Sequence, residues 1–434
     1  MSLVPLHRSR AANNKLPEGR RLISAQPATR PAKVIYIIND LSIGGAEMML
    51  CKLLAETDRT RFCPVVISLM HHAALRERIE ALGIGVYSTK MRPGLPSPLG
   101  LWRLVRLIRR LKPDLIIGWM YHSCLAAQLA NIFSSQGAPI VWSIHYSISS
   151  LNKEKRLTAT AIRVCAFLSK LPAQIIFVSR AAHQQHQLLG YSLDNSSVIP
   201  NGIDVTEFVP SDEARSSVRS ELGLPENALL IGLMGRYHPT KDHSNFLRAA
   251  ALLSRQHPEA HFLLIGRKVD RENQTLCQLI QELGLLDQTH LLGERHDMPR
   301  LAAALDVFSL SSYIESCPNV IGEAMACGVP CVVTDVGDAA WILGNTGRVV
   351  PPRDPNALAA AWREIIDLGL RGRLALGREA RSRVIEHFTL KSVAARYDAL
   401  YENVLARESP AESARKIPGV DLHIDHYFEE TGAR

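Results

Sequence analysis

The sequence lacks the cysteine spacing, the long apolar runs and the leader segment that mark several protein classes. Its eight cysteines show no CxxC pair, which argues against a disulfide framework or structural zinc site and favours reduced thiols. No apolar run reaches about 18 residues, and no basic-then-apolar leader ends in a small-residue cleavage site. We therefore expect a soluble, cytoplasmic protein that can contact the inner face of the plasma membrane peripherally without spanning it.

The positive charge of the chain is concentrated rather than spread. The formal net charge is +8, and residues 1–33 hold seven Lys or Arg against one Glu. Residues 1–32, which are aperiodic and contain Pro and Asn, predict a basic disordered tail. Aromatic residues are not interleaved with the basic ones, so a nucleic-acid groove is not expected.

A second basic concentration is the segment LGLWRLVRLIRRLK, residues 99–112. Its apolar residues recur at helical spacing, at Leu101, Trp102, Val105, Ile108 and Leu111. Arginines largely occupy the other side of the predicted helix. Such a helix can pack its apolar stripe on a sheet and leave a solvated basic face, or it can lie on an anionic membrane. The two interpretations are compatible, because one basic face serves both.

Short apolar runs alternate with helix-length segments, which is the pattern of parallel α/β units. The first series of predicted strands covers residues 33–38, 64–69, 114–119, 139–144 and 174–179. The second series covers residues 229–235, 262–267, 306–312 and 330–335. The expected fold class is α/β with two Rossmann-like, doubly wound parallel-sheet domains, joined near residues 200–225. Ligands of such sheets bind outside the carboxyl ends of the strands, hence in the cleft between the domains.

The loop after the first predicted strand is NDLSIGGAEMML. Gly44 and Gly45 precede a helix beginning near Ala46, so the backbone can approach a ligand closely and helix N–H groups can face a phosphate. The loop does not have the GxGxxG pattern, and no acidic residue marks a nicotinamide ribose site. A dinucleotide oxidoreductase is therefore disfavoured.

The equivalent loop in the second series is GRYHPTKDHSNFL. Arg236 and Lys241 flank a Pro-Thr turn, and Asp242 can cap the helix that follows. An arginine fork and a lysine point charge on one strand-end loop suit a pyrophosphate. We favour this interpretation over the alternative that both residues are ordinary surface cations.

Two acids lie eight residues apart in IESCPNVIGEAMACGVP. Pro318 and Asn319 stand where a helix starts, and Gly328 ends it. Glu315 then precedes the helix, and Glu323 lies in about its second turn. Carboxylates before the helix and in its second turn can each accept hydrogen bonds from vicinal hydroxyls, one from a sugar and the other from a ribose.

These segments, taken together and in this order, resemble retaining glycosyltransferases of family 4, which have the GT-B fold. The resemblance runs across roughly residues 33–405. It rests on GGAE, on VSRAAHQQHQLLGY with VIPNGIDVTEF, on MGRYHPTKDHSNFLRAA and on the E-x7-E of ESCPNVIGEAMACGVPCVVTDVG. It implies an N-terminal acceptor domain at 33–205, a C-terminal donor domain at 206–386, a helix at 387–407 that crosses back, and an irregular tail at 408–434.

The resemblance also implies roles for single residues. Glu315 would contact the donor hexose, and the backbone N–H groups after it, in the segment of Pro318, Asn319 and Val320, would help seat the sugar and phosphate. Glu323 would hold the ribose. The remaining implied site residues are Arg236 and Lys241 at the diphosphate, Gly44 and Gly45 at the phosphate from the first domain, Gly293 in the nucleobase segment LLGERHD, and His145 near the sugar and acceptor.

The implied reaction is hexosyl transfer from a nucleotide sugar, with uridine favoured, to a saccharide or lipid-linked acceptor in cell-surface polysaccharide or lipopolysaccharide synthesis. Fixed cations and a helix N-terminus can stabilise the leaving diphosphate, and the sequence has no DxD-like or His/Cys cluster that demands a metal. No cofactor is therefore expected. Ser316 and Cys317 stand where the family often has Gly-Phe, which affects the expected shape of the sugar pocket.

Two other function classes fit parts of the pattern. A nucleotide-sugar epimerase on the same fold would bind the donor but need its own acid and base. A non-catalytic, membrane-associated nucleotide-sugar binder would not need Arg236, Lys241, Glu315 and Glu323 all intact. Release of nucleoside diphosphate only when an acceptor is added distinguishes the transferase from both.

Overall fold

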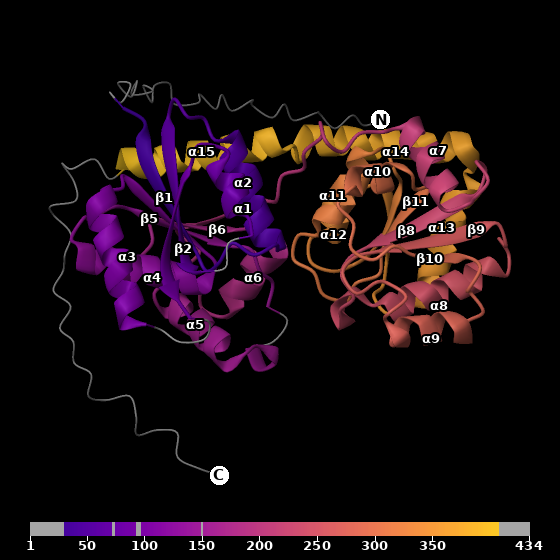
Figure 1. The fold of residues 1–434 in the computed structure, drawn as a ribbon, viewed down its shortest axis with the longest axis horizontal. Coiled ribbons are helices and arrows are strands. Elements are labelled where there is room, and N and C mark those ends of the chain that lie inside the picture. The colour runs from indigo at the N-terminus through magenta and orange to yellow at the C-terminus, as the bar shows by residue number, and fades with distance from the viewer. Residues whose placement is uncertain (1–29, 72–73, 93–96, 149–150, 408–434) are drawn as a thin grey trace, which may run out of the picture.

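The computed structural model describes residues 30–71, 74–92, 97–148 and 151–407. These residues form two parallel sheets with helices on both faces of each (Figure 1). The predicted tails at 1–32 and 408–434 lie outside the described residues, except for residues 30–32, where Arg30 pairs with Asp114 at 2.9 Å.

The first sheet has seven strands in the order β3-β2-β1-β4-β5-β6-β7. Its strands are β1 (Ala32–Ile38), β2 (Phe62–Met70), β3 (Gly85–Met91), β4 (Leu115–Trp119), β5 (Ile140–Ile144), β6 (Gln174–Phe177) and β7 (Ser196–Val198). All neighbouring pairs are parallel. The central strands read as continuous apolar runs because helices cover both faces of the sheet.

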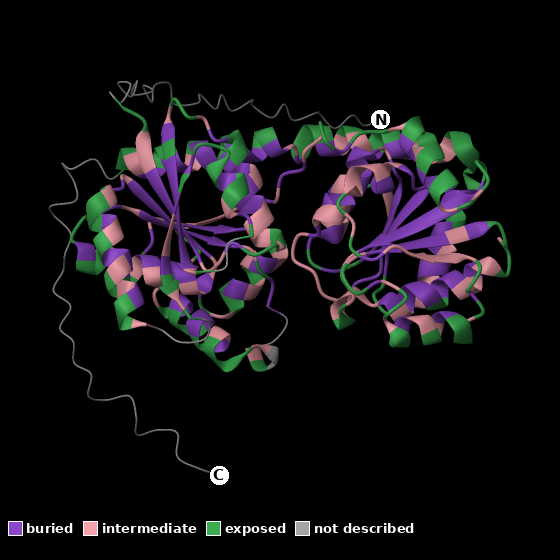
Figure 2. Ribbon diagram, viewed as in Figure 1, coloured by how far each residue is buried: buried purple, intermediate pink, exposed green. Residues whose placement is uncertain are grey.

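The helices of this domain divide between the two faces. They are α1 (Gly45–Glu56), α2 (Arg76–Glu80), α3 (Pro98–Leu111), α4 (Tyr121–Ser134), the 3-10 turn η1 (Leu151–Lys153), α5 (Arg156–Phe167) and α6 (Arg180–Leu188). Buried side chains of α1 and α2 join one core cluster, and those of α3, α4 and α5 join the other. Figure 2 shows the buried strands between helices whose outer faces are exposed.

The second sheet has six parallel strands in the order β10-β9-β8-β11-β12-β13. Its strands are β8 (Leu229–Met234), β9 (Ala260–Ile265), β10 (Thr289–Leu291), β11 (Val307–Leu310), β12 (Cys331–Thr334) and β13 (Gly347–Val350). The strand order reverses between β8 and β11, as it does between β1 and β4 in the first sheet. Ligands of doubly wound sheets bind at such switch points.

The second domain also has helices on both faces. They are α7 (Asp212–Glu221), the 3-10 turn η2 (Pro239–Lys241), α8 (His243–Ser254), α9 (Gln274–Glu282), α10 (Met298–Ala303), α11 (Asn319–Ala326), α12 (Ala339–Leu343), α13 (Pro355–Asp367) and α14 (Gly369–His387). Buried side chains of α8, α9 and α13 belong to one core cluster. Those of α7, α10, α11, α12 and α14 belong to the other.

The last helix, α15 (Leu390–Arg407), leaves the second domain and packs on the first (Figure 1). Its Tyr397 and Tyr401 are buried in the same core cluster as α1. Two chain crossings run side by side at this point, because Ile203 N–H donates to Phe388 O at 2.8 Å and Leu390 N–H donates to Ile203 O at 2.8 Å. A Cβ on Gly202 would lie 2.6 Å from Leu390 Cα, so a larger residue does not fit at this crossing.

The fold class predicted from the sequence is confirmed, with three local corrections. Strands β3, β7, β10 and β13 were not predicted; β7 and β10 have three residues each and no fully buried position. Most of the second half of the predicted junction near residues 200–225 is helix α7, whose start Ser211 caps. In α3 the predicted stripe is wrong at one position, because Trp102 is 55% exposed and Leu104 is buried instead. No helix in the described part of the chain is long and apolar enough to cross a membrane.

Candidate functional site

Glu315 lies on the loop between β11 and α11, and its carboxylate is held from two sides. Lys241 Nζ is 2.5 Å from Glu315 Oε1, and the Ser312 hydroxyl donates to the same oxygen at 2.7 Å. The side chains of Lys241 and Glu315 are 23% and 13% exposed. The predicted sugar-contacting acid and one predicted phosphate cation are therefore already in contact.

The loop that carries Lys241 is fixed by bonds to its neighbours. Asp242 accepts from Asn245 N–H at 3.1 Å and caps α8, as predicted. Ser311 Oγ donates to Lys241 O at 2.8 Å, and Tyr313 N–H donates to Thr240 O at 2.9 Å. These bonds join the β8 loop to the β11 loop. Arg236 lies on the same loop with an exposed side chain, which pairs with no acid among the described residues.

Helix α11 starts at Asn319 with Pro318 at its N-cap, as predicted, and no described side chain caps it. Its first amides, at Asn319 and Val320, are thus suited to an anionic group or a sugar oxygen. Glu323 lies in the second turn, 3.8 Å from Lys52 Nζ of α1 in the first domain. Burial raises the pKa of the Glu323 carboxyl, and Lys52 acts in the opposite direction.

The glycine pair of the first domain lies at the start of α1. Gly44 is the N-cap, and the space around a Cβ on Gly45 is empty to 4 Å. The Glu47 carboxylate folds back here, because its Oε2 would be 2.3 Å from a Cβ on Gly44. Burial raises the pKa of Glu47. A side chain at position 45 would therefore meet no described atom, whereas the Glu47 carboxylate occupies the space beside Gly44.

His145 follows β5 and is held in one orientation. Its Nε2 lies 2.8 Å from Ser143 Oγ, and its ring stacks on Trp119 with centroids 4.2 Å apart. Nδ1 is buried, and the side chain of Asn201 near the ring partly opposes the effect of burial on its pKa. Burial lowers the pKa of His145 to about 3, so the ring is neutral at physiological pH.

Three glycines lie together at the carboxyl ends of β8, β9 and β10. Gly235 N–H donates to Ile265 O, and Gly266 N–H donates to Gly293 O, each at 2.8 Å. A Cβ on Gly266 would lie 2.3 Å from Gly235 O, so these backbones pack without room for side chains. Gly293, predicted in the nucleobase segment, has φ +67, which favours glycine.

Ser316 and Cys317, which stand where the family often has Gly-Phe, are both held by neighbouring residues. Ser316 Oγ lies 2.9 Å from Ser179 Oγ of the first domain. Cys317 packs against the core of the second domain, and burial raises the pKa of its thiol to about 12. Ser316 therefore contributes to the junction between the domains, and Cys317 is a packed thiol rather than a reactive thiolate.

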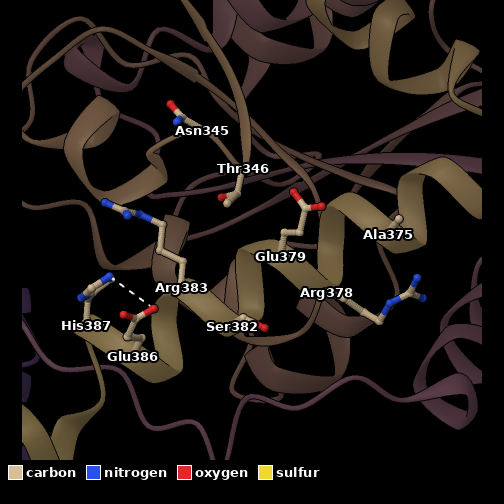
Figure 3. A pocket seen from close by; sticks show the side chains of 9 residues that line it. All are labelled: Asn345, Thr346, Ala375, Arg378, Glu379, Ser382, Arg383, Glu386 and His387. Carbon is tan, nitrogen blue, oxygen red and sulfur yellow. Dashed lines mark ion pairs between the residues drawn. The ribbon is translucent and has the colours of Figure 1, made fainter.

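The structure adds residues that the sequence analysis missed. Lys52 is a lysine on α1 with no motif around it, and Ser312 precedes Glu315 by three residues. A separate groove of about 480 Å³ lies along α14. Its lining mixes Arg378 and Arg383 with Glu379 and Glu386 (Figure 3). None of the predicted site residues lines this groove.

Sequence comparison places these features in a known family. Residues 43–207 match the profile described as Glycosyltransferase Family 4, and residues 228–367 match Glycosyl transferases group 1. The chain belongs to this glycosyltransferase family. Solved structures agree in fold: HepE of Anabaena in complex with UDP has a TM-score of 0.75 at 24% identity, covering 86% of this chain and 100% of HepE. The architecture is therefore GT-B.

Relatives of the family cover parts of the chain. A D-inositol 3-phosphate glycosyltransferase of Nocardioides sp. is 30% identical over 289 residues, which are 61% of this chain and 62% of that protein. The chain thus matches less than two thirds of that relative's length. The putative glycosyltransferase EpsF of Bacillus subtilis is 26% identical, over 70% of this chain and 79% of EpsF. An Escherichia coli UDP-Gal:alpha-D-GlcNAc-diphosphoundecaprenol alpha-1,3-galactosyltransferase is 32% identical, over 34% of this chain and 39% of that enzyme.

Proposed function

We propose that the chain transfers a hexosyl unit from a nucleotide-sugar donor to a saccharide or lipid-linked acceptor, with retention of configuration. The observation that carries the proposal is the arrangement around α11. Glu315 and Glu323 flank the uncapped start of this helix, and Lys241 is bonded to Glu315 from the facing loop. We therefore propose that two hydroxyl-binding acids, the free amides of α11 and a cation from the facing loop act together on one donor in the second domain.

A uridine nucleotide is the proposed donor carrier. The HepE structures hold UDP and UDP-glucose, and the E. coli relative is named for a UDP-galactose donor. We assign Glu323 to the ribose hydroxyls, Gly293 to the nucleobase side and Arg236 with Lys241 to the diphosphate. Arg236 suits this role because it is exposed and carries no described acid partner that a phosphate must displace.

The proposed chemistry needs charge stabilisation more than an acid or base. The bond from the anomeric carbon to the diphosphate oxygen breaks, and the bond to the acceptor oxygen forms on the same face. The departing phosphate takes the acceptor proton. Arg236, Lys241 and the amides of α11 stabilise the charge that develops on the diphosphate. Glu315 positions the hexose and does not attack it. We propose that no metal takes part, so excess chelator should leave turnover unchanged.

The proposed acceptor belongs to the assembly of cell-surface polysaccharide or lipopolysaccharide, at the inner face of the membrane. The support is α3, on which Trp102 and Leu99 are 55% and 54% exposed. Arg106 lies 5.5 Å from the Trp102 ring centroid. Exposed apolar residues beside arginines suit an anionic interface. Vesicles containing anionic lipid should co-sediment the protein, and Trp102→Ala with Arg106→Ala should weaken this. Equal sedimentation of the variant would contradict the contact.

The experiment that tests the main proposal starts with a thermal-shift panel of nucleotide sugars, because a donor stabilises the native state. Nucleoside diphosphate release is then followed with and without candidate acceptors. Glu315→Gln and Glu323→Ala should nearly abolish transfer, and Glu272→Gln, at an exposed acid, serves as the matched control. Wild-type turnover in either site variant would overturn the assignment. Conversion of the donor without any acceptor would favour an epimerase.

A further inference from the structure

The two domains meet at the start of α6, where one carboxylate from the second domain caps the N-terminus of the helix. Asp338 Oδ2 accepts from Arg180 N–H at 2.7 Å, and its Oδ1 accepts from Ala181 N–H at 2.9 Å. The next amide, Ala182 N–H, is capped within the helix by Ser179 Oγ at 2.9 Å. The first three amides of α6 are therefore satisfied, two of them by a residue 157 or 158 positions away.

This contact suits a carboxylate physically. The start of a helix carries partial positive charge and free N–H donors, so a buried anion placed there gains charge-assisted hydrogen bonds. Asp338 is only 3% exposed and Ser179 is fully buried. Arg180 adds a second contact, with its guanidinium 4.3 Å from the Trp341 ring centroid. Arg383 holds the Trp341 backbone by donating to Trp341 O at 2.6 Å.

Asp338 is also tied to the loop that carries Glu315. Asp338 N–H donates to Ser316 O at 2.9 Å. Gly337 has φ +54, and a Cβ there would lie 2.5 Å from Glu315 O, so the two backbones are in direct contact. Ser316 Oγ then reaches Ser179 Oγ at the same helix end. A shift of Asp338 relative to α6 must therefore move the Glu315 loop relative to the first domain.

We propose that Asp338 is a positioning residue that caps α6 across the domain junction and thereby fixes the Glu315 loop against the first domain. The capping contact stands on geometry alone, whereas its effect on turnover rests on the proposed transferase function. The donor-contacting residues assigned above lie mainly in the second domain, and His145 and the proposed acceptor side lie in the first. Losing the cap should therefore disturb transfer more than donor binding.

The test uses Asp338→Asn, which keeps the side-chain shape but removes the charge and turns one acceptor into a donor that faces an N–H group. Asp335→Asn is the matched control, because Asp335 is an exposed acid three residues away. Hydrogen exchange of a peptide covering residues 178–183 reports the capped amides directly. These amides belong to the other domain, so a purely local role of Asp338 in the second domain would not change them.

We expect exchange in this peptide to become about tenfold faster in Asp338→Asn, as a loss of about 1.4 kcal/mol in local protection predicts. The control should exchange as wild type. The kcat should fall about 10- to 100-fold, as expected for a small misplacement of reacting groups, while the donor Kd changes less than about threefold. Unchanged exchange in Asp338→Asn would overturn the proposal. So would a loss of donor affinity as large as the loss of kcat.

Ser316→Ala is the second variant, in case Asp338→Asn does not fold. It removes the other bond to α6 without leaving a buried charge, so the same peptide should exchange faster by a smaller factor. No change in this variant, if Asp338→Asn is unfolded, counts against the proposal. If no donor or acceptor supports transfer, the exchange measurement still decides the capping contact, so failure of the transferase function and failure of the cap are separate results.

Discussion

Replacing Lys241 by Met tests whether the two charges at the proposed sugar site are bonded before any donor arrives. Met keeps the length of the side chain and removes the ammonium, which lies 2.5 Å from Glu315 Oε1. A hydrogen bond to a charged group contributes about 1.5–3 kcal/mol, and the partial exposure of both side chains reduces this. We expect a loss of about 1–2 kcal/mol, or roughly 3–6 °C in the melting temperature of the second domain.

A double-mutant cycle with Glu315→Gln isolates this pair. In the double variant no carboxylate is left without its cation, so the two single losses should not add, and the interaction energy should be about 1–2 kcal/mol. Calorimetry and circular dichroism melts provide the measurement. Arg236→Met is the contrast, because its exposed side chain has no described acid partner. It should change stability by less than about 0.5 kcal/mol and weaken nucleoside diphosphate binding about tenfold.

Two results would refute this reasoning. An interaction energy near zero would mean that Lys241 and Glu315 are not bonded in solution. Equal destabilisation by Lys241→Met and Arg236→Met would mean that pairing in the empty site does not distinguish the two cations.

Buried ionisable side chains give three further predictions. Asp306→Ala should lower the free energy of unfolding by about 3–5 kcal/mol in urea titrations, because Asp306 Oδ2 lies 2.6 Å from Nη2 of the fully buried Arg219. Asp287→Ala, at an exposed acid, should leave the free energy of unfolding unchanged. Lys52→Met removes the cation that opposes the raised pKa of Glu323, so this pKa should rise further. As the pH is lowered, Glu323 should then be protonated earlier, and the variant should lose donor affinity at a higher pH than the wild type does. His145 has a folded pKa of about 3 against an ordinary 6.5, so the unfolded chain binds the proton first and stability declines as pH falls below about 6.5; His145→Gln should remove that part of the decline in melts taken between pH 7 and 4.

Features that depend on residue type and spacing over a few positions could be predicted from the sequence. The Asp242 cap, the start of α11 after Pro318 and the buried central strands all follow from residue type and spacing over a few positions. Strands β7 and β10 did not follow, since they are short, have no fully buried position and exist because a neighbouring strand supplies partners. Trp102 was misplaced because helical spacing alone does not tell whether Trp102 or Leu104, two residues apart, meets the sheet.

The candidate site divides in the same way. The acids, cations and glycines stand in recognisable strand-end loops, so their types and order could be predicted. The contacts of Lys52 with Glu323, of Ser179 with Ser316 and of Asp338 with α6 join residues more than 130 positions apart. No local pattern encodes such pairs, because they arise from how the two domains are placed relative to each other. Their assignment therefore depends on the three-dimensional structure.

The two carboxylates of the E-x7-E segment differ in where their cations come from. Glu315 is paired with Lys241 of its own domain, so this pair stays formed however the domains are arranged. Glu323 has Lys52 of the first domain as its cation, at 3.8 Å, so that attraction exists only while the domains are close. Burial raises the pKa of Glu323 and Lys52 opposes this, so the ionisation of the proposed ribose acid is coupled to a cation of the other domain. The sugar side of the proposed site is thus preformed within one domain, whereas the charge of its ribose side depends on the domain junction.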